Sequence, residues 1–279
     1  MPCRIQTGRH LAHASVDLLW REQDAFEIVD DTGDRRGHGQ KSARKAKAGV
    51  AKTRQRTFLL ARMSTTDKPN LPDLRVSYDQ GELDEHSAPS DPVELFAHWI
   101  KDALAHKLPE PNAMSLATNG LDGTPTVRTV LLKGIDERGF HFYTNYESRK
   151  GHEIAADARA SACFLWTDRH HQVCLKGKIS KLDRADAEQY FASRPYGHQI
   201  GAWVSEQSVV IPGREWLEQR DAEMKSKFPE GQVPCPPHWG GYTLLPDEIE
   251  FWQGRVSRLH DRIRYRKENG MWVKVRLSP

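Results

Sequence analysis

The chain has 279 residues, of which 38% are hydrophobic and 28% charged, and its formal net charge is +3. This balance is typical of a globular protein. No apolar run approaches the roughly 20 residues that a membrane helix needs, and the N-terminus lacks the charged start and apolar stretch of a secretory signal. The sequence therefore argues against a membrane protein and predicts a cytoplasmic one.

Positive charge is concentrated at the N-terminus. Residues 1–62 hold 13 Lys+Arg against 7 Asp+Glu, and residues 35–62 hold ten basic residues and no acidic one. Such a segment cannot bury enough apolar surface to offset its chain entropy, so we expect residues 1–70 to form a basic, disordered extension. A nucleic-acid-binding arm is disfavoured against a solvated tail or a true start at Met63. Residues 71–279 are expected to form the functional domain.

This domain is predicted to open with a helix and to continue mostly with strands. Asp91 and Pro92 suit an N-cap and a first helical position, and apolar residues at helical spacing then predict a helix over 92–106. Apolar runs between Gly-containing turns predict the strands. Strands are expected over 113–118, 126–133, 140–145, 159–166 and 172–182 and within 242–277, and helices over about 184–193 and 213–228. The sum is a mainly antiparallel sheet with helices, which suggests a small barrel.

The four cysteines are Cys3, Cys163, Cys174 and Cys235, and none forms a CxxC pair. Cys163 and Cys174 lie in apolar strand-like runs, which favours small buried hydrophobes over metal ligands or a disulfide. No metal site is expected. The sequence also lacks a GxGxxG after a first strand and a Walker loop, so Rossmann-type dinucleotide binding is not supported.

A phosphate site is predicted around residues 142–150. The strand Phe142-Tyr143-Thr144-Asn145 ends in polar groups, and Ser148-Arg149-Lys150 then opens a helix. Backbone N–H groups, the helix dipole and two cations would converge on an anion there. The alternative is a helix that merely places two cations in its first turn, where the dipole disfavours them.

Two further runs carry cations at strand positions. Arg128 and Lys133 bound an apolar run, and strand alternation would send them to opposite faces. Strand alternation would also place Arg258, His260 and Arg262 on one face. Two arginines beside an imidazole favour its neutral form unless an anion lies among them, so the second run is a candidate anion site.

From about Leu74 to Pro279 the chain closely resembles the pyridoxine (pyridoxamine) 5'-phosphate oxidase family. The matching stretches are RTVLLK (128–133), FYTN (142–145), SRK (148–150), SRP (193–195), QIGAWVSEQS (199–208), WGGY (239–242), EFWQG (250–254), RLHDR (258–262) and the closing RLSP. The resemblance implies an FMN-binding split β-barrel that works as a homodimer with FMN at the subunit interface. It also implies oxidation of pyridoxine and pyridoxamine 5'-phosphate to pyridoxal 5'-phosphate by O2, with release of hydrogen peroxide, and of ammonia from the amine.

The resemblance also implies roles for individual residues. FMN contacts would fall on Arg128, Thr129, Val130, Leu131, Leu132, Lys133, Tyr143, Thr144, Arg149, Lys150, Gln172, Gln207, Ser208, Trp252 and Arg262. Substrate would be bound by Arg75, Tyr78, Lys133, Tyr190, Arg194, His198, Arg258 and His260. Arg258 and His260 would lie against the substrate ring as the catalytic pair, and Arg75 and Tyr78 would belong to a mobile lid.

The sequence departs from the family pattern in two places. His198 stands where the family has a phosphate-binding serine, and Val76 and Ser77 stand in the lid where charged residues are common. A histidine can still donate to phosphate, with added pH dependence. Two alternatives are another split-barrel flavoprotein, such as a flavin reductase, and a non-catalytic pyridoxal phosphate carrier.

Overall fold

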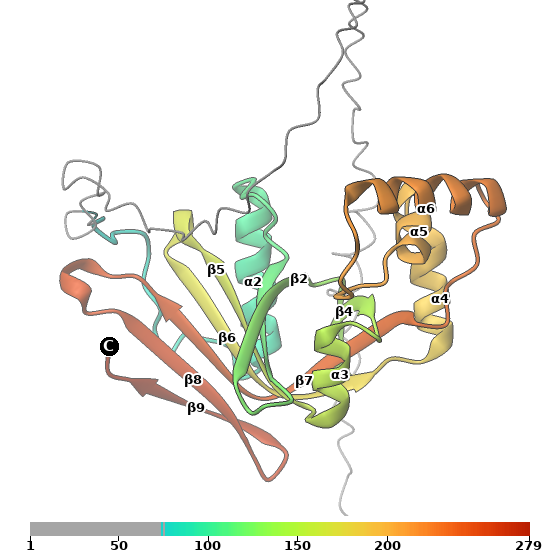
Figure 1. Ribbon diagram of the computed structural model, residues 1–279. Coiled ribbons are helices and arrows are strands. Elements are labelled where there is room, and N and C mark those ends of the chain that lie inside the picture. The colour runs from blue at the N-terminus through green and yellow to red at the C-terminus, as the bar shows by residue number, and fades with distance from the viewer. Residues whose placement is uncertain (1–73, 75) are drawn as a thin grey trace, which may run out of the picture. The chain divides into compact units, whose positions relative to one another are not determined.

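The computed structural model describes residue 74 and residues 76–279 (Figure 1). The predicted N-terminal extension, the possible start at Met63 and the lid residue Arg75 lie outside the described residues. The domain that follows contains five α-helices in its described part. They are α2 (Pro92–Ala105), α3 (Arg149–Ala156), α4 (Arg184–Ser193), α5 (Tyr196–Val204) and α6 (Arg214–Lys227).

The domain is built on one antiparallel sheet with the strand order β2-β1-β5-β6-β7-β4-β3, in which β8 also pairs with β7 and β9 with β8. The strands are β1 (Ala113–Asn119), β2 (Pro125–Leu131), β3 (Gly134–Asp136), β4 (Gly139–Asn145), β5 (Arg159–Trp166), β6 (His171–Lys181), β7 (Trp239–Gln253), β8 (Asp261–Glu268) and β9 (Met271–Leu277). The predicted mainly antiparallel sheet is therefore confirmed. Helix α5 was not predicted, and β2 ends two residues earlier than expected.

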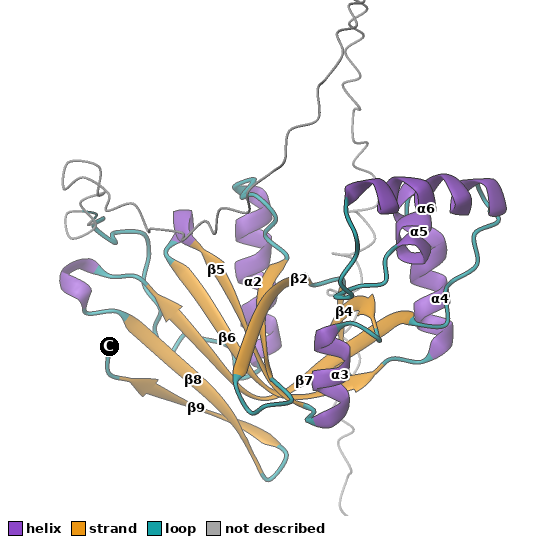
Figure 2. Ribbon diagram, in the orientation of Figure 1, coloured by secondary structure: helices purple, strands orange, loops and turns teal. Residues whose placement is uncertain are grey.

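The long strand β7 joins the two ends of this sheet. One edge of β7 pairs with β6 over 242–253, while the other pairs with β4 over 239–244 and with β8 over 248–253. Pairing of β6 and β7 shifts register between Lys176 and Gly177. A Cβ at Gly177 would lie 2.1 Å from the Leu245 carbonyl oxygen, so this close approach requires glycine. Figure 2 shows α4, α5 and α6 grouped at the β4 end and the β8–β9 hairpin at the other.

Helix α2 fills the inner face of the sheet. Asp91 Oδ1 accepts from the Val93 amide at 2.9 Å, which confirms the predicted N-cap. The Phe96 ring is fully buried, with its centroid 5.0 Å from that of Phe140 and 4.9 Å from that of Phe164 in edge-on contacts. Such aromatic pairs add to the free energy of burial. None of the described helices combines the length and apolar character needed to cross a membrane.

The outer face of the sheet carries a continuous cross-strand row. Each member lies directly opposite the next on the neighbouring strand, from β2 to β9. The row consists of Thr129, Ser115, Cys163, Cys174, Glu250, Arg264 and Val275. Cys163 and Cys174 are only partly buried here, so the prediction of two buried hydrophobes was wrong. Alternation turns both thiols away from the core that their neighbours Phe164 and Val173 fill.

Candidate active site

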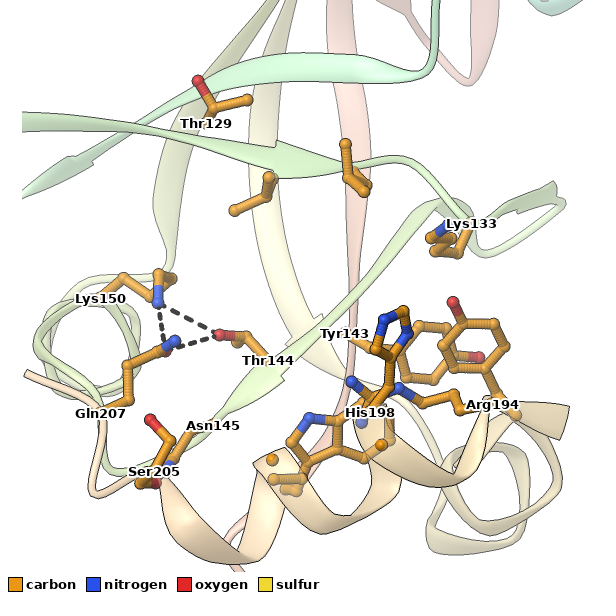
Figure 3. A pocket seen from close by; sticks show the side chains of 17 residues that line it. Thr129, Lys133, Tyr143, Thr144, Asn145, Lys150, Arg194, His198, Ser205 and Gln207 are labelled. Carbon is orange, nitrogen blue, oxygen red and sulfur yellow. Dashed lines mark hydrogen bonds between the residues drawn. The ribbon is translucent and has the colours of Figure 1, made fainter. Parts of the chain in front are cut away.

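A cavity of about 550 Å³ lies between the end of β2, β4 and the helices α3 to α5 (Figure 3). This volume suits a small organic ligand. Its lining, hereafter the pocket, consists of Thr129, Val130, Leu131, Lys133, Tyr143, Thr144, Asn145, Lys150, Tyr190, Arg194, Gly197, His198, Gly201, Ala202, Ser205, Gln207 and Trp239. Lysine and arginine contribute three of these side chains, and none of these lining residues carries a carboxylate. The pocket therefore favours an anionic ligand.

One side of the pocket is a stack of aromatic rings that supports an arginine. The Tyr143 and Tyr190 rings stack with centroids 4.0 Å apart, and Trp239 stacks on Tyr143 at 5.6 Å. Arg194 Cζ lies 4.7 Å from the Trp239 ring centroid, and its Nη1 is buried without a hydrogen-bond partner. Burial lowers the pKa of Arg194. Because an unpaired buried guanidinium nitrogen is costly, Arg194 is poised to donate to an anion.

The opposite side of the pocket is a polar cluster around Lys150. Lys150 Nζ donates to Gln207 Oε1 at 2.7 Å, to Thr144 Oγ1 at 3.1 Å and to Ser148 Oγ at 3.2 Å. Burial and, less strongly, repulsion from Arg128 lower the pKa of Lys150 to about 8. Figure 3 shows Lys150, Thr144 and Gln207 on one side of the pocket and Lys133, Arg194 and His198 on the other. The pocket thus offers two separate cationic positions.

Helix α3 places Lys150 at the pocket. Ser148 caps the helix, because its Oγ accepts from the Gly151 amide at 3.3 Å, so the predicted Ser-Arg-Lys helix start is confirmed. A Cβ at residue 151 would lie 1.9 Å from the Tyr146 carbonyl oxygen. Only glycine permits this close packing of the first helical turn against the end of β4.

A buried carboxylate lies behind the pocket. Glu153 is 1% exposed, and its Oε2 accepts from Arg128 Nη2 at 2.7 Å and from the hydroxyls of Thr118 and Thr126 at 2.6 and 2.7 Å. Its Oε1 accepts from Arg149 Nε at 2.9 Å. Burial alone would raise the pKa of Glu153, but these hydrogen bonds lower it to about 2. Glu153 therefore stays ionised and fixes both arginines.

A second group of predicted residues lies at the far end of β7. The Trp252 and His260 ring centroids are 4.6 Å apart, and Tyr78 meets them edge-on at 5.8 and 5.5 Å. Gln172 on β6 and Arg262 on β8 lie directly opposite Trp252. We call these residues, together with the neighbouring Arg258, the β7 cluster. The predicted lid residue Tyr78 thus contacts predicted catalytic and cofactor-binding residues.

The backbone around His260 differs from the prediction. Arg258 belongs to a 3-10 turn, Val256–Arg258, with φ of 57° at Ser257 and 60° at Arg258, and β8 begins only at Asp261. The expected single strand through Arg258, His260 and Arg262 was therefore wrong. Arg258 is exposed, while Arg262 Nε donates to Glu250 Oε1 at 2.8 Å.

The predicted neutral imidazole is supported. Desolvation and repulsion from Arg258 lower the pKa of His260 despite the nearby Asp261. The His260 Nδ1 atom accepts from the Arg255 amide at 3.1 Å. Since a neutral imidazole carries one proton, Nε2 holds it and can donate.

The predicted site residues therefore fall into two places on one chain. Tyr143 lies opposite Gly241 and Gln172 lies opposite Trp252, and the eleven residue-to-residue steps along β7 between these positions span roughly 35 Å. Thr129, Val130, Leu131, Lys133, Tyr143, Thr144, Lys150, Tyr190, Arg194, His198 and Gln207 line the pocket. Gln172, Trp252, Arg258, His260, Arg262 and Tyr78 do not. Arg128 points to Glu153 behind the pocket, and Leu132 is fully buried in the core.

Two further predicted residues, Arg149 and Ser208, do not line the pocket but follow or precede lining residues in the chain. The Arg149 side chain is 65% exposed, and its amide donates to Ser208 Oγ at 3.2 Å. Sequence reasoning missed the lining residues Asn145, Ser205 and Trp239, although they stand in the stretches FYTN, QIGAWVSEQS and WGGY. Glu153 was also missed, since a carboxylate four residues after an arginine on a helix is ordinarily a solvated pair.

Comparison with known proteins follows this division of the chain. Residues 100–227 match a family model described as pyridoxamine 5'-phosphate oxidase, and residues 239–279 match one described as the pyridoxine 5'-phosphate oxidase C-terminal dimerisation region. The chain is 54% identical over 210 residues to a pyridoxine/pyridoxamine 5'-phosphate oxidase of Cupriavidus pinatubonensis, a match that covers 75% of this chain and 99% of the relative. A namesake from Burkholderia cenocepacia is 52% identical over 212 residues, again covering 75% and 99%.

The chain belongs to the pyridoxine/pyridoxamine 5'-phosphate oxidase family. Solved structures agree with this membership. PhzG from Burkholderia lata, determined with tetrahydrophenazine-1-carboxylic acid, aligns with a TM-score of 0.69 and 31% identity over 73% of this chain and all of PhzG. A pyridoxamine 5'-phosphate oxidase-related, FMN-binding protein from Nostoc punctiforme aligns with a TM-score of 0.55 and 18% identity over 69% and 98% of the two chains, and so shares the fold.

These comparisons confirm the predicted family and the predicted mainly β, FMN-binding split barrel, and they agree with FMN as the cofactor. This member of the oxidase family also carries the family's dimerisation region at its C-terminus, which supports the predicted homodimer. That region, 239–279, contains most of the β7 cluster. The individual roles of the site residues stay predictions.

Proposed function

We propose that this protein oxidises pyridoxine 5'-phosphate and pyridoxamine 5'-phosphate to pyridoxal 5'-phosphate with FMN and O2, releasing hydrogen peroxide and, from the amine, ammonia. The observation that carries the proposal is the pair of cationic positions on opposite sides of one carboxylate-free pocket. FMN and the substrate each bring one phosphate, so two anion positions are what the reaction needs. We also propose a cytoplasmic location.

The pocket residues divide between the two phosphates. Lys150, with Thr144 and Gln207, would hold the FMN phosphate at the start of α3, where the helix dipole adds to the attraction. Lys133, Arg194 and His198 would hold the substrate phosphate together with Tyr190. Because the substrate phosphate is remote from the reacting carbon, charge-assisted bonds to it would orient the ring without taking part in the chemistry.

Bound FMN would supply the hydride acceptor. This chain's residues would bind and orient the substrate against it. A second copy of the chain would bring its β7 cluster to the pocket, with Gln172, Trp252 and Arg262 toward FMN and Arg258 and His260 toward the substrate ring. The His260 Nε2–H group would donate a hydrogen bond to an oxygen attached to the substrate ring. FMN would then lie at the interface of a two-fold dimer, whose two sites are equivalent.

Two observations support this dimer. The β7 cluster lies roughly 35 Å along β7 from the pocket, and this separation supports a site to which two chains contribute. The outer sheet face exposes apolar side chains on β2, β5 and β9, including Val127 at 69% and Leu165 at 58%, and such a face favours association.

The test supplies purified, FMN-loaded protein with pyridoxine 5'-phosphate in air and measures pyridoxal 5'-phosphate and peroxide together. We expect the two products in equal amounts. Tight FMN binding with neither product would overturn the proposal and favour a carrier. FMN reduction by NADH or NADPH without aldehyde formation would favour a flavin reductase.

A second candidate function follows from the match to PhzG. An oxidase for a tricyclic carboxylic acid would also need a cationic pocket. Offering tetrahydrophenazine-1-carboxylic acid in the same assay separates the two, because the two-phosphate arrangement predicts faster turnover of the phosphorylated substrate.

A further inference from the structure

An arginine at the start of helix α4 binds the backbone of a loop that is distant in the sequence. Arg184 Nη1 donates to the carbonyl oxygens of Pro236 at 3.0 Å and Trp239 at 2.9 Å. Arg184 Nη2 donates to the Cys235 carbonyl oxygen at 2.6 Å. We call residues 235–239 the 235–239 loop. One guanidinium therefore joins α4 to three carbonyl groups of this loop.

The place of Arg184 in its own helix is unfavourable. It is the first residue of α4, where the helix dipole disfavours a cation. Its Nε donates to Glu188 Oε1 at 2.9 Å, one helical turn further on, and this contact aims the guanidinium away from the helix axis. A loop with consecutive prolines at 236 and 237 forms no regular backbone ladder, so its carbonyl groups need side-chain donors. Arg184 supplies them.

The 235–239 loop carries the ring that supports Arg194. Trp239 is 7% exposed, its ring stacks on Tyr143 with 12° between the ring planes, and Arg194 Cζ lies 4.7 Å from its centroid. Arg194 directly follows the last residue of α4. Helix α4 thus presents Arg194 at one end and, through Arg184 at the other, holds the ring against which Arg194 lies.

We propose that Arg184 is a positioning residue for the substrate phosphate, acting through Trp239 on the Arg194 guanidinium. The inference rests on the proposed function, because it takes Arg194 to hold that phosphate. Arg184 itself is not among the residues that line the pocket. Lys150 lies on the opposite side of the pocket (Figure 3), so FMN binding should not depend on Arg184.

The test titrates FMN-loaded full-length protein with pyridoxal 5'-phosphate and with pyridoxal, and follows binding by the flavin absorbance spectrum. Neither titration requires turnover. Arg184→Gln should weaken binding of pyridoxal 5'-phosphate about tenfold, because a small displacement of Arg194 loosens its contacts with the phosphate. The affinities for pyridoxal and for FMN should stay within about twofold, because these ligands do not use Arg194 and separate contacts respond independently.

Two further variants separate positioning from charge and from stability. Arg184→Lys keeps the charge, but its single nitrogen does not reproduce the planar fork that reaches three carbonyl groups, so most of the loss should persist. This variant also serves if Arg184→Gln folds poorly. Arg138→Gln is the matched control, because Arg138 joins the same helix to β3 by donating to Asp186 and Asp136. It should lower stability to urea and keep the parent's preference for the phosphorylated ligand.

A double variant shows whether Arg184 acts through Arg194. In an Arg194→Ala background, Arg184→Gln should cause no further loss of pyridoxal 5'-phosphate affinity, because the guanidinium that it positions is already absent. Two changes that act independently would instead give losses that multiply.

Other outcomes overturn the inference. An unchanged preference in Arg184→Gln, multiplying losses in the double variant or full recovery in Arg184→Lys would each overturn the positioning role and leave the proposed function intact. A parent protein that binds pyridoxal as tightly as pyridoxal 5'-phosphate would overturn the proposed phosphate site, and the role of Arg184 with it.

Discussion

The pocket and the β7 cluster are built in different ways. In the pocket, Lys150 already has three hydrogen-bond acceptors, and Arg194 rests on a stack of aromatic rings. In the β7 cluster, Arg258 is exposed on a turn in the left-handed region. The first arrangement is complete within one chain and suits tight binding of phosphates. The second is completed only by a partner chain in the proposed dimer, and the proposed contacts of Arg258 and His260 with the substrate ring depend on that chain.

Loss of the Glu153 carboxylate behind the pocket should have the largest effect, and that effect is on stability. Glu153→Gln removes the only carboxylate that pairs with both Arg128 and Arg149 in the described structure, so we expect a loss of about 3 kcal/mol in the free energy of unfolding. Urea denaturation measures this, with the exposed Glu147→Gln as control. The parent should also lose this contribution as the pH falls from about 4.5 to about 2, because the Glu153 pKa is lowered on folding. A change equal to that of the control would mean that Glu153 does not support the pocket.

Removal of Arg194, one of the cations proposed to hold the substrate phosphate, should weaken substrate binding without weakening cofactor binding. Arg194→Ala should raise KM for pyridoxine 5'-phosphate about 100-fold, because a half-buried charge-assisted contact is lost. The affinity for FMN, followed by flavin fluorescence, should change little. Arg214→Ala, at an 81% exposed arginine, is the control. An equal loss of FMN affinity would contradict the division of the pocket into two anion positions.

A substitution in the β7 cluster should lower kcat instead. Arg258→Ala should lower turnover roughly 30-fold by loosening the substrate ring over the flavin. FMN affinity should stay within about twofold, because the proposed FMN contacts are other residues of the pocket and of the β7 cluster. Exposed Arg266→Ala, on the strand β8 that follows this turn, is a suitable control. Equal losses of turnover and FMN affinity would count against the assignment of Arg258 to the substrate ring.

A pH series should give the smallest effect and report on one side chain. Lys150 has a pKa of about 8, so its ammonium attracts phosphate below that pH and is progressively neutralised above it. FMN affinity should therefore fall by up to about tenfold per pH unit above 8. Lys150→Arg should flatten this dependence, since a guanidinium stays charged. A parallel fall in both proteins would assign the pH dependence to another group.

Local signals in the sequence predicted most elements, and long-range pairing explains what they missed. Two helix starts could be predicted from Asp91-Pro92 and Ser148-Arg149-Lys150, because a helix cap depends on residues only a few positions apart. By contrast, the left-handed turn at Ser257 and Arg258 has no local signal, because neither residue favours positive φ. The role of Glu153 depends on Thr118 and Arg128 from two other strands. Helix α5 contains Gly197 and Gly201, which weaken its helical signal.

The pocket and the β7 cluster both include residues of β7, and this arrangement has a genetic consequence. In the proposed dimer, each site takes its pocket from one chain and its β7 cluster from the other. A chain with Arg194→Ala and a chain with Arg258→Ala, each impaired alone, would then form a mixed dimer with one doubly altered site and one unaltered site. An allele damaged in the pocket and an allele damaged in the β7 cluster would complement each other in the same cell, whereas two alleles damaged in the same part would not.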